Sequence, residues 1–207
     1  MSLTNIPMDE FINLMKPFDP KIIMEIGSLN GADSILFKKS FPDSRVITIE
    51  GLPANYSLYL KNFFTNIETY NLVINSYDGV VDYFEKDVNG IHGIYDRGSE
   101  YGTKKLSLPC MRIDSFCNVN NINYIDAVKI DVEGATLEVL ESFGDILKTV
   151  KIMHIETEDY EFFKNQHLQS DVHKFLIENK FENILSRGAI IQSNHKQYDE
   201  VWVRKNE

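Results

Sequence analysis

The sequence predicts an α/β fold, a doubly wound and mostly parallel seven-stranded sheet that ends in an antiparallel C-terminal hairpin. Strand and helix patterns alternate over residues 22–179, the order that covers both faces of a parallel sheet with helices. Residues 22–34 give a strand, a glycine-containing turn and a helix, the first half of a βαβ unit. The last two strand patterns, 182–186 and 200–204, have no helix between them, so one of them has to run antiparallel.

Length and composition indicate one globular domain. The 207 residues are 43% hydrophobic and 25% charged, which is ordinary for a protein with a full hydrophobic core. We expect a single domain over residues 1–207, with an N-terminal helix within 1–20 and a β-rich insertion at 80–112. No repeat, linker or low-complexity tract interrupts the chain.

Charge and cysteine content argue against several classes of protein. The formal net charge of −10 disfavours nucleic acid and anionic membranes as partners. No apolar run approaches ~18 residues and the N-terminus lacks a secretory signal, so we expect no membrane insertion and a cytoplasmic location. Cys110 and Cys117 are too few for a disulfide framework or a Cys-only zinc site, so reduced thiols are expected.

Apolar periodicity and helix-breaking residues place the elements in order along the chain. Short apolar runs predict strands, and apolar side chains three or four residues apart predict helices. The predicted strands are 21–26, 45–50, 68–75, 124–131, 150–155, 182–186 and 200–204. The predicted helices are 7–16, 32–40, 53–64, 116–120, 135–143, 161–168 and 172–179. Pro17 and Pro20 end the first helix, and Asp114 or Ser115 is expected to cap helix 116–120.

The insertion is less regular than the rest of the chain. Short alternating runs at 80–84, 91–95 and 106–112 are separated by glycines and predict antiparallel strands or a hairpin extension. Residues 95–105 between them predict a polar loop. Such a loop could close over a substrate, although a surface loop without that role is the more common case.

The turn after the first strand allows a ligand to approach closely. Residues 25–31 follow the spacing E-x-G-x-x-x-G, and neither Gly27 nor Gly31 has a Cβ to block the backbone. In open α/β sheets such a turn lies at the carboxyl edge, where ligands bind. The spacing differs from the G-x-G-x-x-G of dinucleotide-binding proteins.

Polar residues also follow the next two strands. Glu50 lies 23 residues after Gly27, close to the ~20-residue interval at which an acidic side chain meets the ribose in nucleotide-binding βαβ units. A carboxylate can accept hydrogen bonds from both ribose hydroxyls; the alternative is a solvated carboxylate at a strand end. Asn75, Ser76 or Asp78 could bond the adenine amine, although an Asp-Gly turn needs no ligand to explain it.

Residues 128–140 carry the most specific pattern. They read V-K-I-D-V-E-G-A-T-L-E-V-L and resemble the K-I-D-V-E-G-x-E-x-x-V-L segment of the FkbM family of S-adenosylmethionine-dependent methyltransferases. Residues 25–31 resemble the D-x-G-A-N-x-G cofactor loop of that family, 49–53 its F-E-P-x-P, and 112–116 its T-L-D-x-L. Glu156 resembles its late strand-end Glu. The resemblance covers residues 22–181.

The resemblance implies a Rossmann-like methyltransferase fold, S-adenosylmethionine as cofactor, and O-methylation of a hydroxyl on a saccharide or other small molecule. The residues expected to bind the cofactor are Glu25, Gly27, Ser28, Asn30, Gly31, Glu50, Asn75, Ser76 and Asp131. Three departures from the family pattern, at Glu25, Gly51 and Thr136, leave open a binding module that has lost activity. A nicotinamide-dependent oxidoreductase is the other alternative; the glycine spacing and the terminal hairpin argue against it.

Four side chains are candidates for catalysis. Asp131 ends its strand and Glu133 lies two residues further on, in the turn. His154 and Glu156 share one face of a later strand, because side chains alternate with a period of two. A hydroxyl nucleophile has to lose its proton, so a carboxylate or imidazole within hydrogen-bond reach assists methyl transfer. We expect the four side chains to converge if the two strands are adjacent.

Each candidate also has a plainer explanation. Asp131 could contact the amino group of the cofactor, Glu133 could stabilise a helix N-terminus, and His154 could be a structural histidine. The cluster could hold a divalent cation, but one histidine and several carboxylates do not specify a ligand set, so no metal is predicted. The histidines expected on the surface are His92, His167, His173 and His195. The sequence identifies neither the acceptor nor the oligomeric state.

Overall fold

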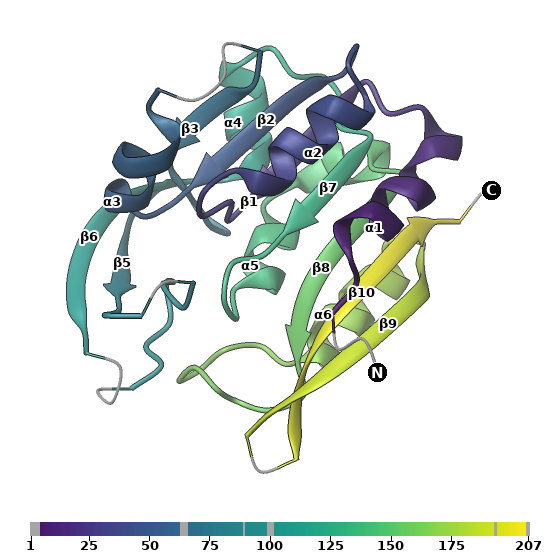
Figure 1. The fold of residues 1–207 in the computed structure, drawn as a ribbon. Coiled ribbons are helices and arrows are strands. Elements are labelled where there is room, and N and C mark those ends of the chain that lie inside the picture. Colours follow the sequence, from purple (N-terminus) through teal and green to yellow (C-terminus); the bar gives the residue numbers. More distant parts are fainter. Residues whose placement is uncertain (1–4, 63–65, 89, 99–101, 193, 206–207) are drawn as a thin grey trace.

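The large sheet of the computed structural model has the predicted architecture. The structure describes residues 5–62, 66–88, 90–98, 102–192 and 194–205. Seven strands follow one another in the order β3-β2-β1-β7-β8-β10-β9 (Figure 1). Their bounds are Ile22–Ile26 (β1), Arg45–Glu50 (β2), Glu68–Asn71 (β3), Ala127–Ile130 (β7), Ile152–Glu158 (β8), Phe181–Gln192 (β9) and His195–Arg204 (β10). The first five in this order are parallel, and β10 is antiparallel to both β8 and β9. The predicted fold class is confirmed.

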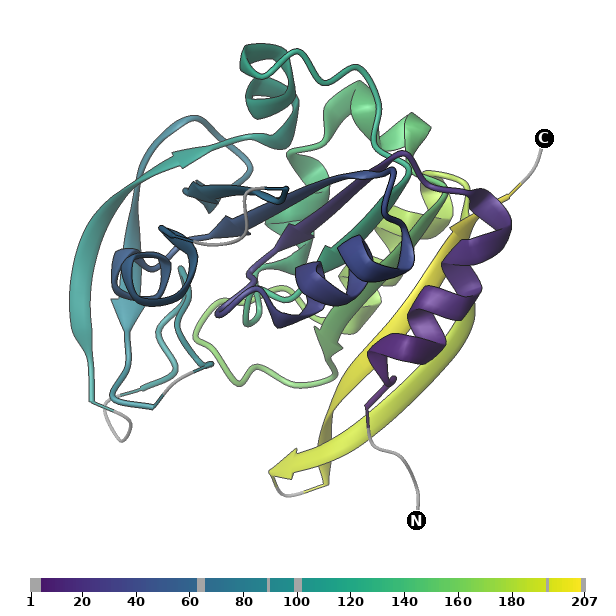
Figure 2. The ribbon, with the colours of Figure 1, turned by 45° about the horizontal axis from the view of Figure 1, so that its top comes forward.

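Helices cover both faces of this sheet (Figures 1 and 2). The helices that pack on it are α1 (Met8–Met15), α2 (Ala32–Ser40), α4 (Ile113–Val119), α5 (Thr136–Glu141) and α6 (Gln169–Glu178). Phe11 of α1 and Phe37 of α2 share a buried cluster with Ile23 of β1. Met24, the next residue of β1, belongs to the cluster on the other face, which contains the apolar side chains of α4, α5 and α6. Successive side chains of β1 therefore pack into the two hydrophobic cores on opposite faces of the sheet.

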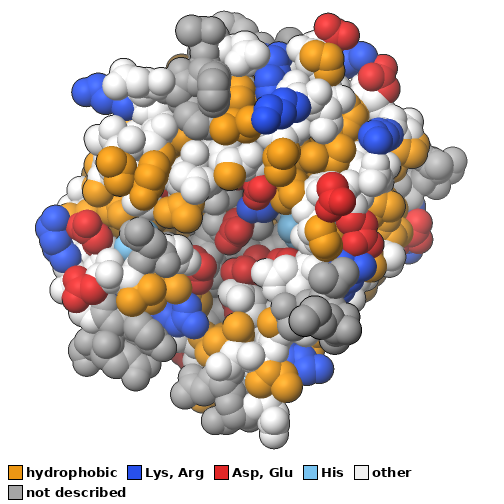
Figure 3. Space-filling view, in the orientation of Figure 1, with side chains coloured by type: hydrophobic (Ala, Val, Ile, Leu, Met, Phe, Trp, Pro, Cys, Tyr) orange, Lys and Arg blue, Asp and Glu red, His pale blue; other side chains and the backbone are white. Residues whose placement is uncertain are grey.

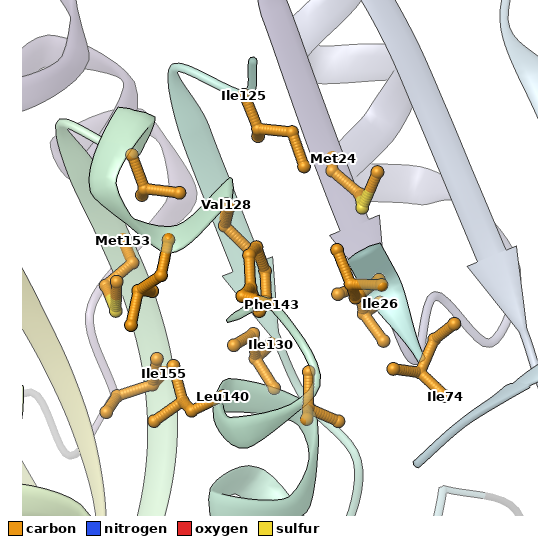
Figure 4. Packing of buried hydrophobic residues seen from close by; sticks show 14 of the residues in the cluster. Met24, Ile26, Ile74, Ile125, Val128, Ile130, Leu140, Phe143, Met153 and Ile155 are labelled. Atoms are coloured by element: carbon orange, nitrogen blue, oxygen red, sulfur yellow. The ribbon is translucent and has the colours of Figure 1, made fainter. Parts of the chain in front are cut away.

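The core between the sheet and α5 fixes the edge at which the site lies. Figure 4 shows Phe143 and Leu140 packed over residues of β7 and β8, with Met24 and Ile26 of β1 beside them. Phe143 and Leu140 are fully buried. Because this packing holds parallel strands in register, the segments that follow β1, β7 and β8 leave the sheet at the same edge.

Two predicted helices and one predicted helix cap differ from the structure. Helix 53–64 is shorter: α3 covers Pro53–Asn55, a π-helical turn covers Tyr56–Leu60, and 63–65 lie outside the described residues. Within this segment Tyr59 is exposed and Leu60 is buried. Residues 161–168 are not helical, because Asn165 is left-handed and the Phe163 N–H is taken by the Gln166 side chain. Helix α4 begins at Ile113 with no side-chain cap, so the predicted cap at Asp114 or Ser115 is wrong.

The insertion forms a second sheet of three strands in the order β4-β6-β5, which lies beside α3 (Figure 1). Its strands are β4 (Val73–Ile74), β5 (Gly79–Glu85) and β6 (Lys104–Met111). The predicted strand 68–75 is thus split between two sheets. The predicted strand 91–95 reduces to one bridge between Phe84 and Gly93. Residues 99–101 of the predicted loop lie outside the described residues.

The C-terminal hairpin is longer than predicted. Strands β9 and β10 extend through the region between residues 186 and 200 that the sequence presents as a variable turn. Within the part of the chain that the structure describes, no helix has the length and apolar character needed to cross a membrane.

Candidate active site

The turn after β1 lies directly against the end of β7. Gly27 has a φ of +80°, and its N–H donates to the Ile49 carbonyl at 2.9 Å. A Cβ built on Gly27 would lie 1.8 Å from the carbonyl oxygen of Asp131. That carbonyl cannot easily move, because the Asp131 N–H is held by the Ile26 carbonyl at 2.9 Å. Glycine is therefore required at this position.

Glu50, at the end of β2, holds the same turn. Its Oε2 accepts a hydrogen bond from Leu29 N at 2.8 Å, and its Oε1 accepts one from Leu52 N at 2.8 Å. Leu29 has a φ of 53°, a left-handed conformation that costs a leucine about 1–2 kcal/mol. Burial raises the pKa of Glu50, while the two N–H groups act in the opposite direction. The Asn55 side chain also hydrogen-bonds this carboxylate, which still has the capacity to accept a further hydrogen bond from a ligand hydroxyl.

A cavity of about 220 Å³ opens beside this turn. Figure 3 shows that the middle of this face is hollowed and that acidic side chains gather in the hollow. Residues in or just after the ends of β1, β2, β7 and β8 form part of its wall, and residues 72–74 and the insertion form the rest. The lining residues are Ile26, Gly27, Leu29, Glu50, Gly51, Asn55, Leu72, Val73, Ile74, Tyr83, Gly90, His92, Gly93, Ile94, Asp131, Val132, Glu133, Ala135 and Glu156.

Three predicted catalytic carboxylates meet in this cavity. One oxygen each of Asp131, Glu133 and Glu156 lies within 4.8 Å of the others. The Asp131 carboxylate accepts a hydrogen bond from Lys129 Nζ at 3.0 Å, and Arg97 Nη1 lies 3.6 Å from Glu133 Oε2. Burial, and then the neighbouring carboxylates, raise the pKa values of Glu133 and Glu156 well above the ordinary range. Glu156 Oε1 has no hydrogen-bond partner among the described residues.

This arrangement suits proton abstraction. A carboxylate with a raised pKa and an oxygen that no other group occupies can accept the proton of a bound hydroxyl near neutral pH. Three carboxylates at this spacing are also the group in the described part of the chain that could hold a divalent cation. They do not select a particular metal, and the expectation of a metal-free site stays a prediction.

His154 does not line the cavity with the three carboxylates. It is 5% exposed, its ring lies 5.2 Å from that of Phe11 under α1, and its Nε2 is 3.8 Å from Asp199. Burial, reinforced by the charge of Lys129, lowers its pKa to about 3. The imidazole is therefore neutral at physiological pH and packed in the layer beneath α1.

Glu25 also lies outside the cavity, on the face of the sheet that α2 covers. Its Oε2 accepts hydrogen bonds from the backbone N–H and the hydroxyl of Ser34, in the first turns of α2. Burial raises its pKa to about 7, although Lys129 and Ser34 act in the opposite direction. These contacts make Glu25 an anchor between β1 and α2.

This raised pKa predicts that the protein loses stability as the pH rises. The folded state binds the Glu25 proton more tightly than the unfolded chain does, so its contribution is complete below about pH 4.5 and is lost by about pH 7. We expect a contribution of about 1–3 kcal/mol to the free energy of unfolding at pH 5 relative to pH 8. Urea denaturation at both pH values should show a smaller difference in Glu25→Gln; an equal difference would contradict the assignment.

The remaining predicted cofactor residues do not line the cavity. Asn30 Oδ1 accepts a hydrogen bond from Ala32 N, Gly31 is the left-handed N-cap of α2, and Ser28 is buried. Asn75 Oδ1 accepts a hydrogen bond from Ser76 N. These residues lie in the two turns, and Leu29, between Ser28 and Asn30, lines the cavity. Of the predicted cofactor set, Gly27, Glu50 and Asp131 line it.

The insertion contributes wall residues that the sequence did not indicate. Tyr83 of β5 packs against Gly51, where a Cβ would lie 3.2 Å from its ring. His92 is 8% exposed and lines the cavity, so the expectation that it lies on the surface is wrong. Gly93 lies against the Glu133 carbonyl: a Cβ built on Gly93 would lie 3.3 Å from the carbonyl oxygen. No local pattern marks these residues, because their position depends on how the second sheet folds onto the first.

Two comparisons with sequences of known proteins agree on the class of the protein. Residues 21–185 match the methyltransferase FkbM domain family. The chain is also 21% identical over 173 residues to the 2-O-methyltransferase NoeI of Sinorhizobium fredii, a match that covers 76% of this chain and 71% of NoeI.

Solved structures share the fold at low sequence identity. The methyltransferase FkbM from Methylobacillus flagellatus KT superposes with a TM-score of 0.54 at 13% identity, over 87% of this chain and 44% of that chain. The O-methyltransferase from Bacillus cereus, solved in complex with SAH, gives a TM-score of 0.54 at 12% identity, over 98% and 84% of the two chains. Since the family match spans most of the chain, this protein belongs to the FkbM family of methyltransferases.

Proposed function

We propose that the protein is an S-adenosylmethionine-dependent O-methyltransferase that acts on a hydroxyl group of a saccharide or other small molecule. The observation that carries the proposal is the meeting of Asp131, Glu133 and Glu156 in a cavity that the Gly27 turn and Glu50 also line. The family supports the methyltransferase class, and the name of NoeI, a 2-O-methyltransferase, supports transfer to oxygen.

The described residues fit this cofactor. Gly27 has no Cβ, so the turn can lie directly against the Asp131 carbonyl while it lines the cavity. Glu50 is in place to accept a hydrogen bond from a ribose hydroxyl with the acceptor capacity that Leu29, Leu52 and Asn55 do not use. Leu72, Val73 and Ile74 give the same end of the cavity an apolar wall suited to a purine ring.

The acidic side chains supply the protein's part of the reaction. Bound S-adenosylmethionine supplies an electrophilic methyl group on a sulfonium. Glu156 accepts the proton of the acceptor hydroxyl as the new C–O bond forms and the C–S bond breaks. Glu133, held by Arg97, and Asp131, held by Lys129, border the same space and can accept further hydrogen bonds from the acceptor.

The charge of the cavity favours an acceptor without acidic groups. Four carboxylates line it, those of Glu50, Asp131, Glu133 and Glu156. Among the described residues, Arg97 pairs with Glu133 and Lys129 with Asp131. An anionic group placed among the carboxylates would be repelled, whereas hydroxyls can donate to them. Together with the net charge of −10, this supports a neutral small-molecule or saccharide acceptor over a nucleic acid.

Calorimetry and a transfer assay test the proposal. We expect the wild type to bind S-adenosylhomocysteine with a Kd on the order of 1–100 μM. Labelled methyl transfer is then measured across a panel of methyl glycosides and other polyols. Absence of binding to the wild type would refute the proposal. Binding without transfer to any member of a broad panel would favour a module that kept the site and lost activity.

Glu50→Ala is expected to weaken S-adenosylhomocysteine binding about 10- to 100-fold, because it removes charged hydrogen-bond acceptors worth about 1.5–3 kcal/mol. Glu68→Ala is the matched control, since Glu68 of β3 pairs with Arg45 of β2 and does not line the cavity. Titration calorimetry of both variants, with thermal melts to check folding, measures the difference. Equal affinities in the two variants would remove Glu50 from the binding site.

A further inference from the structure

His92 is a buried polar residue in the cavity wall for which the reaction above has no use. It lies in the segment after β5, which is tied back to that strand by the bridge between Phe84 and Gly93. Its side chain is 8% exposed and lines the cavity. A polar group in such a position is expected to have a partner, and one of its two ring nitrogens has none among the described residues.

The partner of the other nitrogen fixes the tautomer. The backbone N–H of Lys86 donates to His92 Nδ1 at 3.0 Å, so Nδ1 has to present its lone pair. A neutral imidazole carries one proton, which therefore lies on Nε2. Burial lowers the pKa of His92, although Glu85 acts in the opposite direction, and this favours the neutral ring. His92 Nε2 is thus a buried hydrogen-bond donor without a partner among the described residues.

The neighbours of His92 indicate which part of a ligand it would meet. The segment is paired with β5, whose Tyr83 packs on Gly51, the residue after Glu50. Tyr83 marks the end of the cavity to which the proposed function assigns the nucleoside, and Gly93, the residue after His92, lies against the Glu133 carbonyl. His92 therefore belongs to the part of the wall between the nucleoside end and the carboxylates. The wall at the nucleoside end is otherwise rich in apolar side chains, those of Leu72, Val73 and Ile74. Adenine ring nitrogens and ribose oxygens are acceptors, and a donor in this wall would satisfy one of them.

We propose that His92 is a cofactor-binding residue, which donates its Nε2–H to an acceptor atom of the adenosyl group of S-adenosylmethionine. The inference rests on the proposed function, because it takes the cofactor from there. In this tautomer His92 does not act as a general base, because Nδ1 accepts the hydrogen bond from Lys86 and Nε2 already carries a proton.

Two amide variants separate ligand binding from a structural role. In His92→Asn the amide oxygen can replace Nδ1 and accept from Lys86, but no donor reaches the position of Nε2. In His92→Gln the longer amide can place an N–H near the position of Nε2, at the expense of the contact with Lys86. We expect S-adenosylhomocysteine to bind about 3- to 10-fold more weakly to His92→Asn than to the wild type, and His92→Gln to retain most of the affinity.

His195→Asn is the matched control, since His195 lies on the hairpin, is partly exposed and stacks on Tyr160 away from the cavity. Thermal melts check the folding of each variant. A purely structural role for His92 reverses the order, with His92→Asn like the wild type and His92→Gln weakened. That result, or equal affinity in all the variants, overturns the proposal. A wild type that does not bind S-adenosylhomocysteine would refute the proposed function as well.

Nitrogen-15 NMR of histidine-labelled wild-type protein decides the case in which both amide variants bind weakly. We expect the His92 signals to show the Nε2–H tautomer without ligand and the Nε2 resonance to shift when S-adenosylhomocysteine is added. An Nδ1–H tautomer, or an Nε2 resonance that does not respond to the ligand, would overturn the proposal.

Discussion

The substitution Gly27→Ala is expected to abolish S-adenosylhomocysteine binding and to lower the free energy of unfolding by on the order of 2–4 kcal/mol. The added Cβ would lie 1.8 Å from the Asp131 carbonyl oxygen, and relief requires that β1 and β7 separate at the edge where the cofactor is proposed to bind. The φ of +80° adds a second penalty for any residue with a Cβ. Urea denaturation and titration calorimetry measure the two effects.

Gly98→Ala is the matched control for this prediction. Gly98 has a φ of +98°, yet none of the described residues comes within 4 Å of its would-be Cβ, and it does not line the cavity. This variant isolates the backbone penalty, about 1 kcal/mol, from the clash. We expect it to bind S-adenosylhomocysteine like the wild type. A Gly27→Ala variant no less stable than Gly98→Ala would show that the two strands can part without cost.

The architecture of the large sheet could be predicted because its central strands, β1, β2, β7 and β8, are buried on both faces. Such strands appear in the sequence as short apolar runs, and the alternation of runs with helices leaves few possible topologies. The errors fall where the chain leaves this pattern. Residues 161–168 have helical periodicity, but their backbone follows the contact between Phe163 and Gln166. Strand 68–75 breaks at Leu72, because its second half joins the small sheet.

Strand register explains why three of the four predicted catalytic residues line the cavity and His154 does not. Lys129 of β7 is opposite His154 of β8, and Ile130 is opposite Ile155. The next pair, Asp131 and Glu156, comes where β7 ends and the cavity begins. His154 lies on the same face of β8 as Glu156 but two residues earlier in the strand. It is therefore beside Lys129 under α1 and does not reach the cavity. The period of two predicts on which face of a strand a side chain lies. How far that side chain lies from the cavity depends on the register between strands, which the sequence does not reveal.

The same reasoning applies to Glu25 and to the wall that the insertion provides. Glu25 is opposite Thr48 and Lys129, inside the sheet, and reaches Ser34 of α2. The cofactor-loop pattern marks where the turn begins and does not say which of its side chains face the ligand. Tyr83 and His92 come from a region where sequence periodicity is weak, and their place in the cavity follows from contacts between the two sheets.

Glu156→Gln is expected to lower kcat about 10²- to 10⁴-fold with an acceptor that the wild type methylates, because it removes the general base. Binding of S-adenosylhomocysteine should be retained, since Glu156 is not assigned to the cofactor. Glu178→Gln, on the exposed side of α6, is the control and should keep the wild-type rate. Asp131→Asn provides the comparison within the cluster: if it loses more activity than Glu156→Gln, the base is Asp131.

The pH dependence of the rate tests the same assignment independently. Glu156 has to be ionised to accept a proton, and burial together with the charges of Asp131 and Glu133 raises its pKa. The wild-type kcat should therefore fall as the pH drops through that raised pKa, at a higher pH than for an ordinary glutamate. In Glu156→Gln the residual rate should lose this acid limb, because the amide does not titrate. An acid limb that persists unchanged would belong to another group and would exclude Glu156 as the base.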